Sequence, residues 1–150
     1  NFMGYSTRPT LDMLAFGNSA IGDVCDRFAQ NTPLVDPYEQ TVARGELPVV
    51  RGLELSADDR MRRSVILHLM CNLELPWDVT RQSWGATVPE LIGGIEARLE
   101  PLAGEGLITL DQAGLHVTDL GRFFLRNVAM EFDAYLDDPE DDRPRYSRTV

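Results

Sequence analysis

Lysine is absent from the 150-residue sequence, cysteine occurs only twice, and no apolar run approaches the roughly 20 residues that a transmembrane helix needs. The 14 basic residues are therefore all arginine, and with 24 acidic residues they leave a net charge of −10. That charge repels phosphate backbones and anionic membranes alike, so we expect neither nucleic acid nor a membrane as a partner. The start, NFMGYSTRPT, also lacks the basic flank and apolar stretch of a signal peptide, and we expect a soluble, cytoplasmic protein.

Cysteine and histidine are too scarce to predict a metal centre. Cys25 and Cys71 lie in different segments, and neither they nor His68 and His116 have partners at the spacings of known metal sites. We interpret Cys71, inside the apolar string VILHLMCNL, as a small buried hydrophobic residue. The sequence therefore predicts no metal ligand in this chain, and we single out no catalytic residue in it.

The first region, residues 1–35, contains a compact apolar run, LDMLAFG, followed by the small residues NSAIG. A run that is apolar on both faces predicts a strand buried in a sheet covered on both sides, with a turn over residues 17–22. In a turn of small residues the backbone can approach a ligand closely, although FGNSAIG matches neither the dinucleotide nor the P-loop pattern. Such a strand needs neighbours that this region does not supply, which indicates a part of a larger protein.

A connector, residues 36–55, is expected to contain one short helix. Asp36 is placed to cap it with Pro37 at its first helical position, and Gly45 followed by Pro48 would end it.

The third region, residues 56–136, has the pattern of a self-contained domain. Ser56 with Asp59 resembles a capping box, and apolar residues at every fourth position predict an amphipathic helix over 57–73. A short helix is expected at 78–84.

The second half of this region also has clear start signals. Thr87 with Glu90 forms another capping box, at the start of a helix that we expect to reach about residue 103. The apolar stretches 107–110 and 115–117 flank a turn and predict a hairpin. Thr118 is then expected to cap a last helix that extends to about residue 136. Three helices, a hairpin and a closing helix make a winged-helix-like arrangement, and residues 137–150 form an acidic tail that we expect to be mobile.

A winged helix suggests DNA binding, but the helix at the recognition position has the wrong charge. Residues 87–103 contain Glu90, Glu96 and Glu100, and Arg98 is their only basic residue. Phosphate contacts require the opposite balance, so a structural or protein-docking role is favoured.

Arginines cluster near the start of the helix predicted over 57–73. Arg60, Arg62 and Arg63 lie near the positive end of its dipole, where cations are mildly unfavourable. Ion pairing with Asp58, Asp59 and other nearby carboxylates is the favoured interpretation, and an anion clamp for propionate-like carboxylates is the alternative.

A second arginine pair lies on the predicted closing helix. Arg122 and Arg126 are four residues apart and would share one helix face, which would either grip an adjacent domain or remain solvated.

Six strings of the sequence are distinctive: NFMGYST at 1–7, FGNSAIGD at 16–23, FAQN at 28–31, RRSVILHLMCNL at 62–73, GRFFLRNVAMEFDAYL at 121–136 and YSRTV at 146–150. Together they resemble the C-terminal portion of the oxygen-independent coproporphyrinogen III oxidase family of radical S-adenosylmethionine (SAM) enzymes, also called coproporphyrinogen dehydrogenases. The resemblance covers nearly the whole chain, and RRxVIxxLMCNL and GRxxxRNxAMxFDxYL are its most specific motifs.

The resemblance implies an enzyme of heme (porphyrin) biosynthesis that oxidatively decarboxylates coproporphyrinogen III to protoporphyrinogen IX without oxygen. A 4Fe-4S iron-sulfur cluster and SAM would be its cofactors. The CxxxCxxC motif that holds the cluster in this family is absent here, so the chain is expected to be inactive without the N-terminal radical-SAM barrel, its implied partner.

The resemblance also implies the site residues. Phe2, Met3 and Ile21 match positions that line the SAM site, and Ile21 is the favoured apolar contact. Met3 stands where the family usually has glutamine, which removes a hydrogen-bond donor and acceptor. Four arginines become candidates for substrate contact or domain docking: Arg62, Arg63, Arg122 and Arg126.

The resulting prediction is an α+β fold, with strands from the end of an incomplete (β/α) barrel followed by a mainly helical winged-helix-like domain. That second domain would help to complete the SAM site and cover the substrate. The alternative function is a non-catalytic, acidic winged-helix module that binds another protein.

Overall fold

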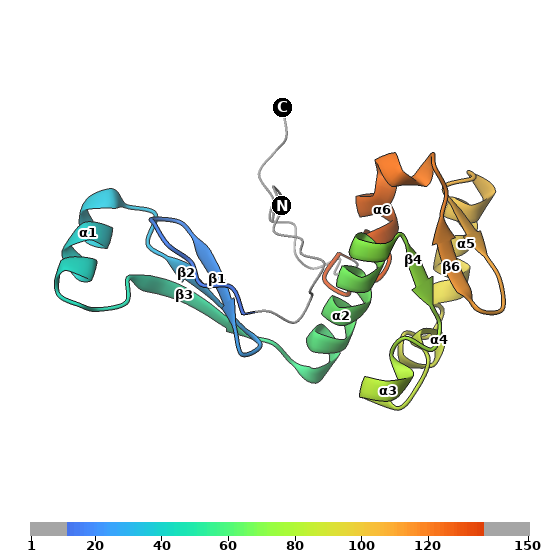
Figure 1. Ribbon diagram of the computed structural model, residues 1–150, viewed down its shortest axis with the longest axis horizontal. Coiled ribbons are helices and arrows are strands. Elements are labelled where there is room, and N and C mark those ends of the chain that lie inside the picture. The colour runs from blue at the N-terminus through green and yellow to red at the C-terminus, as the bar shows by residue number, and fades with distance from the viewer. Residues whose placement is uncertain (1–11, 137–150) are drawn as a thin grey trace. The chain divides into compact units, whose positions relative to one another are not determined.

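A computed structural model describes residues 12–136, and its elements form a mixed α+β fold of two small antiparallel sheets and several short helices (Figure 1). The chain divides into two compact units, residues 1–67 and 68–150. Within the described range, no helix combines the length and apolar character that crossing a membrane requires. The predicted tail, residues 137–150, lies outside that range.

The first unit is built on a three-stranded antiparallel sheet. Its strands are β1 (Ile21–Val24), β2 (Arg27–Asn31) and β3 (Val49–Glu54), in the order β1-β2-β3. The β1–β2 hairpin turns at Cys25 and Asp26, whose φ angles of 50° and 60° are both left-handed, as a two-residue type I′ turn requires. Cys-Asp is not the usual Asn-Gly or Asp-Gly signal for that turn, which is why the sequence did not predict this hairpin.

The strand predicted in LDMLAFG is a wrong prediction. Within the described residues of this run, Met13 makes one isolated bridge, to Asp23 of β1, and the side chains of Leu14 and Phe16 are 68% and 84% exposed. A strand requires hydrogen-bonding neighbours along its length, and this segment has one at a single position.

Helix α1 (Val35–Ala43) lies in the connection between β2 and β3, beyond the end of the sheet (Figure 1). Its N-cap is Leu34, so Asp36 lies in the first turn instead of capping the helix as predicted. Gly45, with φ of 74°, follows the C-cap Arg44 and ends the helix as expected. Strand β3 then occupies most of LPVVRGLEL, for which the sequence predicted no element.

Helix α2 (Ala57–Asn72) confirms the predicted amphipathic helix and continues from the first unit into the second. Its capping box is formed: the Ser56 N–H donates to Asp59 Oδ2 at 2.9 Å, and the Asp59 N–H donates to Ser56 Oγ at 3.1 Å. Met61, Val65 and Leu69 recur every fourth residue and are all buried.

The second unit contains the predicted hairpin, β5 (Ile108–Leu110) with β6 (Gly114–Val117), and a third strand, β4 (Glu74–Pro76), pairs with β6. The Asp111 carboxylate accepts hydrogen bonds from the N–H groups of Ala113 and Gly114 at 2.7 and 2.9 Å, which closes the turn. These bonds favour the ionised form and lower the pKa of Asp111.

The helix predicted over 87–103 is two helices, α4 (Val88–Leu91) and α5 (Ile95–Gly104), after the short α3 (Arg81–Trp84). The capping box of Thr87 and Glu90 is present as predicted, but Gly94 has φ of 78° and breaks the helix.

The predicted closing helix is also divided, into a 3-10 turn η1 (Gly121–Phe124) and α6 (Leu125–Met130). The Gly121 N–H donates to Thr118 Oγ1 at 3.0 Å, but the N-cap of η1 is Leu120, two residues later than predicted. Phe124, with φ of −113° and ψ of 19°, leaves helical geometry between the two elements. The buried hydrophobic residues of the second unit include Leu69, Leu75, Val88, Ile95, Leu99, Ile108, Leu115, Val128 and Phe132.

Candidate functional site

Ile21, the residue favoured as an apolar cofactor contact, is the first residue of β1 and is 52% exposed. The next residue, Gly22, is buried, and a Cβ on it would lie 3.2 Å from the carbonyl oxygen of Met13. A side chain at position 22 would therefore press on the backbone of the preceding segment. The backbone of Gly22 thus lies close to the backbone of Met13, while the side chain of Ile21 stays accessible to a ligand.

The small-residue turn before Ile21 is tied to the sheet by buried polar groups. The Asn31 side-chain amide donates to the carbonyl of Gly17 at 2.9 Å, and the Asn31 N–H donates to the carbonyl of Ala20 at the same distance. The Tyr38 hydroxyl accepts the Gly17 N–H at 2.9 Å, so α1 also contributes to holding the turn. Asn31 is only 6% exposed, so these bonds are largely shielded from water.

The arginines at the start of α2 are engaged in ion pairs, as the favoured interpretation predicted. Arg62 Nε donates to Asp58 Oδ2 at 2.6 Å, one turn earlier on the same helix. Arg63 pairs with Asp23 of β1, and its guanidinium lies 5.6 Å from the centre of the Phe28 ring of β2. These pairs disfavour the alternative that Arg62 and Arg63 form an anion clamp.

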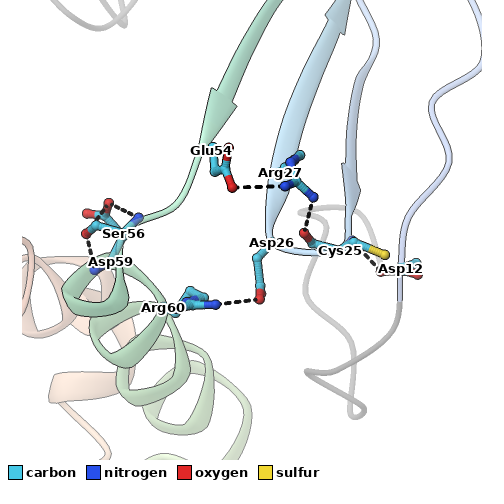
Figure 2. A network of polar contacts seen from close by, with 8 residues as sticks. All are labelled: Asp12, Cys25, Asp26, Arg27, Glu54, Ser56, Asp59 and Arg60. Atoms are coloured by element: carbon cyan, nitrogen blue, oxygen red, sulfur yellow. Dashed lines mark hydrogen bonds and ion pairs between the residues drawn. The ribbon is translucent and has the colours of Figure 1, made fainter.

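A further polar network surrounds the β1–β2 turn (Figure 2). Arg60 of α2 reaches Asp26 at the turn, as Figure 2 shows, and Arg60 Nη1 lies 3.3 Å from Asp26 Oδ2. On the other side, the Cys25 N–H donates to the carboxylate of Asp12 at 2.9 Å. Arg27 pairs with Glu54 across β2 and β3 at 2.9 Å. The two left-handed residues of the turn are thus held from several sides.

The other candidate arginines do not share one helix. Arg122 lies on η1, 3.8 Å from Asp119, whereas Arg126 lies on α6 beyond the break at Phe124. Both residues are exposed. Because part of the chain between them is a 3-10 turn, their spacing of four residues is not one full turn of an α-helix. The two arginines therefore do not lie on one continuous α-helix, and their common face stays a prediction. Phe2 and Met3 lie outside the described residues.

The described residues do not fit an iron-sulfur cluster bound by cysteines. Cys25 and Cys71 belong to different units, and within residues 12–136 no three His, Cys, Asp or Glu side chains gather in a group able to hold a metal ion. His116, on β6, has Glu74 and Asp111 at 3.6 and 3.8 Å, and all three side chains are about half exposed. We assign no step of chemistry to any of these groups.

Sequence reasoning did not single out Asp23 and Asn31, although they hold β1 and the turn before it. The available signal was polarity within short strands, because a buried polar residue on a strand needs a specific partner. Both residues do fall in the recognised strings FGNSAIGD and FAQN.

Comparison with known proteins connects this geometry to one family. Residues 55–124 match the HemN C-terminal domain. The chain is 36% identical over its full 150 residues to the oxygen-independent coproporphyrinogen III oxidase of Pseudomonas aeruginosa, and covers 32% of that protein. It is also 39% identical to the enzyme of the same name from Salmonella typhimurium. That match extends over 136 residues and covers 91% of this chain and 30% of the Salmonella protein.

The fold agrees with a solved relative. Coproporphyrinogen III oxidase from Escherichia coli, a radical SAM enzyme, matches with a TM-score of 0.80 and a sequence identity of 38%. The match covers 90% of this chain and 31% of the E. coli chain.

Residues 55–124 therefore have the sequence pattern of a HemN C-terminal domain. The chain as a whole is homologous to the C-terminal region of oxygen-independent coproporphyrinogen III oxidase and spans about a third of the length of these relatives. The resemblance seen in the sequence motifs is thereby confirmed.

Proposed function

We propose that this chain is the C-terminal region of a cytoplasmic enzyme that oxidatively decarboxylates coproporphyrinogen III to protoporphyrinogen IX without oxygen in heme biosynthesis. The observation that carries this proposal is the 36% identity to the Pseudomonas aeruginosa enzyme, which extends over the entire chain. The catalytic residues and cluster ligands would lie in the preceding radical-SAM barrel, which is the proposed partner. A 4Fe-4S cluster and SAM, when bound there, would supply the radical that abstracts a propionate hydrogen.

Within this function, Ile21 is the proposed apolar contact to SAM, together with Phe2 and Met3. The exposed side chain of Ile21 and the firmly held turn before it support the assignment. A contact residue must present its side chain to a ligand while its backbone stays in place, and Ile21 satisfies both conditions.

Residues 1–35 would then complete the end of the barrel, and residues 56–136 would form a winged-helix-like domain that covers the substrate. Among the arginines, Arg122 and Arg126 are better candidates for docking or propionate contact than Arg62 and Arg63. The reason is exposure: Arg122 and Arg126 are exposed, whereas Arg62 and Arg63 are partly buried beside carboxylates.

The test is a chimera in which this chain replaces the matching C-terminal part of the Pseudomonas aeruginosa enzyme. The reconstituted protein is assayed anaerobically with SAM and coproporphyrinogen III, beside the native enzyme and the N-terminal part alone. We expect protoporphyrinogen IX from the chimera and none from the N-terminal part. Ile21→Asp should abolish product formation, because a carboxylate desolvated against the cofactor is costly.

The control is Leu34→Asp, which places the same charge on a side chain that is 62% exposed outside the proposed site. This variant should keep most of the activity. A folded, cluster-loaded chimera that forms no product would reject the proposal, and the acidic protein-interaction module would then be the better description.

A further inference from the structure

Asp23 is a buried carboxylate whose side chain pairs with a residue from a distant part of the chain. The residue is 8% exposed, and it pairs with Arg63, which is 40 positions later and on a different element. Removing a charge from water is expensive, and a buried ion pair persists because each partner compensates the other. The pair is therefore a strong constraint on where β1 and α2 lie relative to each other.

Asp23 also joins the remaining segments of the first unit. Its N–H and carbonyl pair with Met13 at 2.8 and 2.7 Å. Across the sheet it faces Phe28 of β2, which in turn faces Leu53 of β3. The Arg63 guanidinium lies over the Phe28 ring, so one side chain contacts two adjacent strands. The Arg63 side chain is only 27% exposed, consistent with a structural position.

The strand geometry places Asp23 next to Ile21, the proposed cofactor contact. Ile21 and Asp23 are two residues apart on β1, and residues separated by two lie on the same face of a sheet. Their Cα atoms are then about 7 Å apart at the usual rise of a strand. A shift of β1 that follows the loss of the Asp23 partner would therefore move the backbone of Ile21.

We propose that Arg63 is a positioning residue for SAM: through Asp23 it holds β1, and thereby Ile21, where the cofactor binds. The inference rests on the proposed function and adds to it a role for an arginine outside the cofactor site. Arg63 neither contacts the cofactor nor takes part in the chemistry. This assignment replaces the earlier candidate role in which Arg63 contacts a substrate propionate.

Arg60 provides a matched comparison. It lies on the same helix and also pairs with an aspartate of the β1–β2 hairpin, Asp26, but both side chains are more than 40% exposed. Exposed ion pairs contribute little to stability, because water screens the charges. Removing Arg60 should therefore leave β1 in place, although it deletes the same charge from the same helix.

The experiment measures equilibrium binding of SAM and of coproporphyrinogen III to the cluster-loaded chimera carrying Arg63→Gln, Arg63→Lys or Arg60→Gln. We expect Arg63→Gln to raise the Kd for SAM by about tenfold and to change the Kd for coproporphyrinogen III by less than about twofold. Arg63→Lys keeps the charge and should recover most of the affinity for SAM. Arg60→Gln should change neither Kd by more than about twofold.

A double-mutant cycle tests whether Arg63 acts through Asp23. Asp23→Asn should weaken SAM binding by itself, and adding Arg63→Gln to it should weaken binding by less than about a further twofold. Independent, multiplying losses would overturn the proposal. It would be overturned equally by an unchanged Kd for SAM, or by a loss confined to coproporphyrinogen III, which would indicate direct propionate contact. If Arg63→Gln does not fold, Asp23→Asn is measured in its place. A Kd for SAM raised by about tenfold then supports the proposal, and an unchanged Kd overturns it.

Failure of the wider function is distinguishable from failure of this inference. A parent chimera that makes product establishes the function, and an unaltered Kd for SAM in Arg63→Gln then rejects the role of Arg63 alone. A folded parent chimera that neither binds SAM nor makes product rejects both proposals.

Discussion

The two units of this chain differ in what keeps them folded. In the described part of the first unit, β1, β2, β3 and α1 contain no buried large hydrophobic residue, and the buried side chains include the polar Asp23, Asn31 and Thr32. Leu47, Phe16 and Leu14 are among the exposed apolar side chains there, at 85%, 84% and 68%. In the second unit, by contrast, α2, α4, α5 and the hairpin strands all contribute fully buried aliphatic residues.

The buried aliphatic residues show that the second unit has a hydrophobic core of its own. Hydrophobic burial is the dominant favourable term in folding, so the second unit has the means to be stable by itself. The buried hydrophobic residues of the first unit, Leu55, Met61 and Val65, lie in α2 or just before it. Its sheet and α1 depend instead on backbone hydrogen bonds, two left-handed turn residues and ion pairs, each of which is worth less in net free energy. Leu14 and Phe16, which precede Ile21, are exposed apolar side chains that the proposed barrel would cover.

The largest expected effect is on amide hydrogen exchange in the isolated chain. Amides of β1, β2 and β3 should exchange at least about 100-fold faster than those of α5 and β6, because local opening costs little where few apolar contacts are lost. Exchange followed by mass spectrometry on peptides from each unit measures this directly. In the chimera, protection of the first unit should rise, whereas equal protection of both units in the isolated chain would contradict the comparison.

Truncating the core should distinguish the units by stability. Leu69→Ala removes a fully buried side chain and should lower the free energy of unfolding by about 2–5 kcal/mol. Leu53→Ala, at a position of β3 that is 54% exposed, should change it by less than about 1 kcal/mol. Urea unfolding followed by circular dichroism measures both variants. A larger loss for Leu53→Ala would show that the sheet unit has a hydrophobic core after all.

Glycine substitutions test the close packing of the second unit at a finer scale. A Cβ on Gly121 would collide with the carbonyl oxygen of Leu107, so Gly121→Ala should cost about 1–3 kcal/mol. Gly93→Ala is the matched control, because a Cβ there meets nothing within 4 Å. We expect that control to be neutral or slightly stabilising in thermal unfolding. Equal midpoints for the two variants would mean that η1 moves away from the hairpin without cost.

The smallest effect concerns the capping box of α4. The pKa of Glu90 is lowered mainly by the hydrogen bond from the Thr87 side chain and, second, by the hydrogen bond from the Thr87 backbone N–H. A carboxyl whose folded pKa is lowered stabilises the protein above its unfolded pKa, and that contribution is lost as the pH falls through the folded pKa. Unfolding midpoints between pH 7 and pH 3 should therefore fall less steeply for Glu90→Gln than for the parent chain. Parallel pH profiles would show that the box is not formed in solution.

Interactions between residues close in the chain were predictable from the sequence. Both capping boxes join residues three apart, α2 follows a repeat of four, and Asp111 closes a turn of adjacent residues. The motifs also predicted the family, since RRSVILHLMCNL and GRFFLRNVAMEFDAYL are the most specific strings of the resemblance. The ion pairing of the arginines at the start of α2 was likewise predicted, but only Asp58 among the partners was named.

Tertiary structure alone decided what depends on distant contacts. The departure at Phe124 occurs inside a segment whose local pattern favours one continuous helix, whereas Gly93 and Gly94 already weakened the helix predicted over 87–103. The hairpin turn at Cys25 and Asp26 forms without a sequence signal, and its side-chain partners, Asp12 and Arg60, come from outside the hairpin. The pairing of Arg63 with Asp23 bridges 40 positions. Local propensity is read from neighbouring residues, whereas a buried charge takes whichever partner the fold brings to it, and only the packed structure shows that partner.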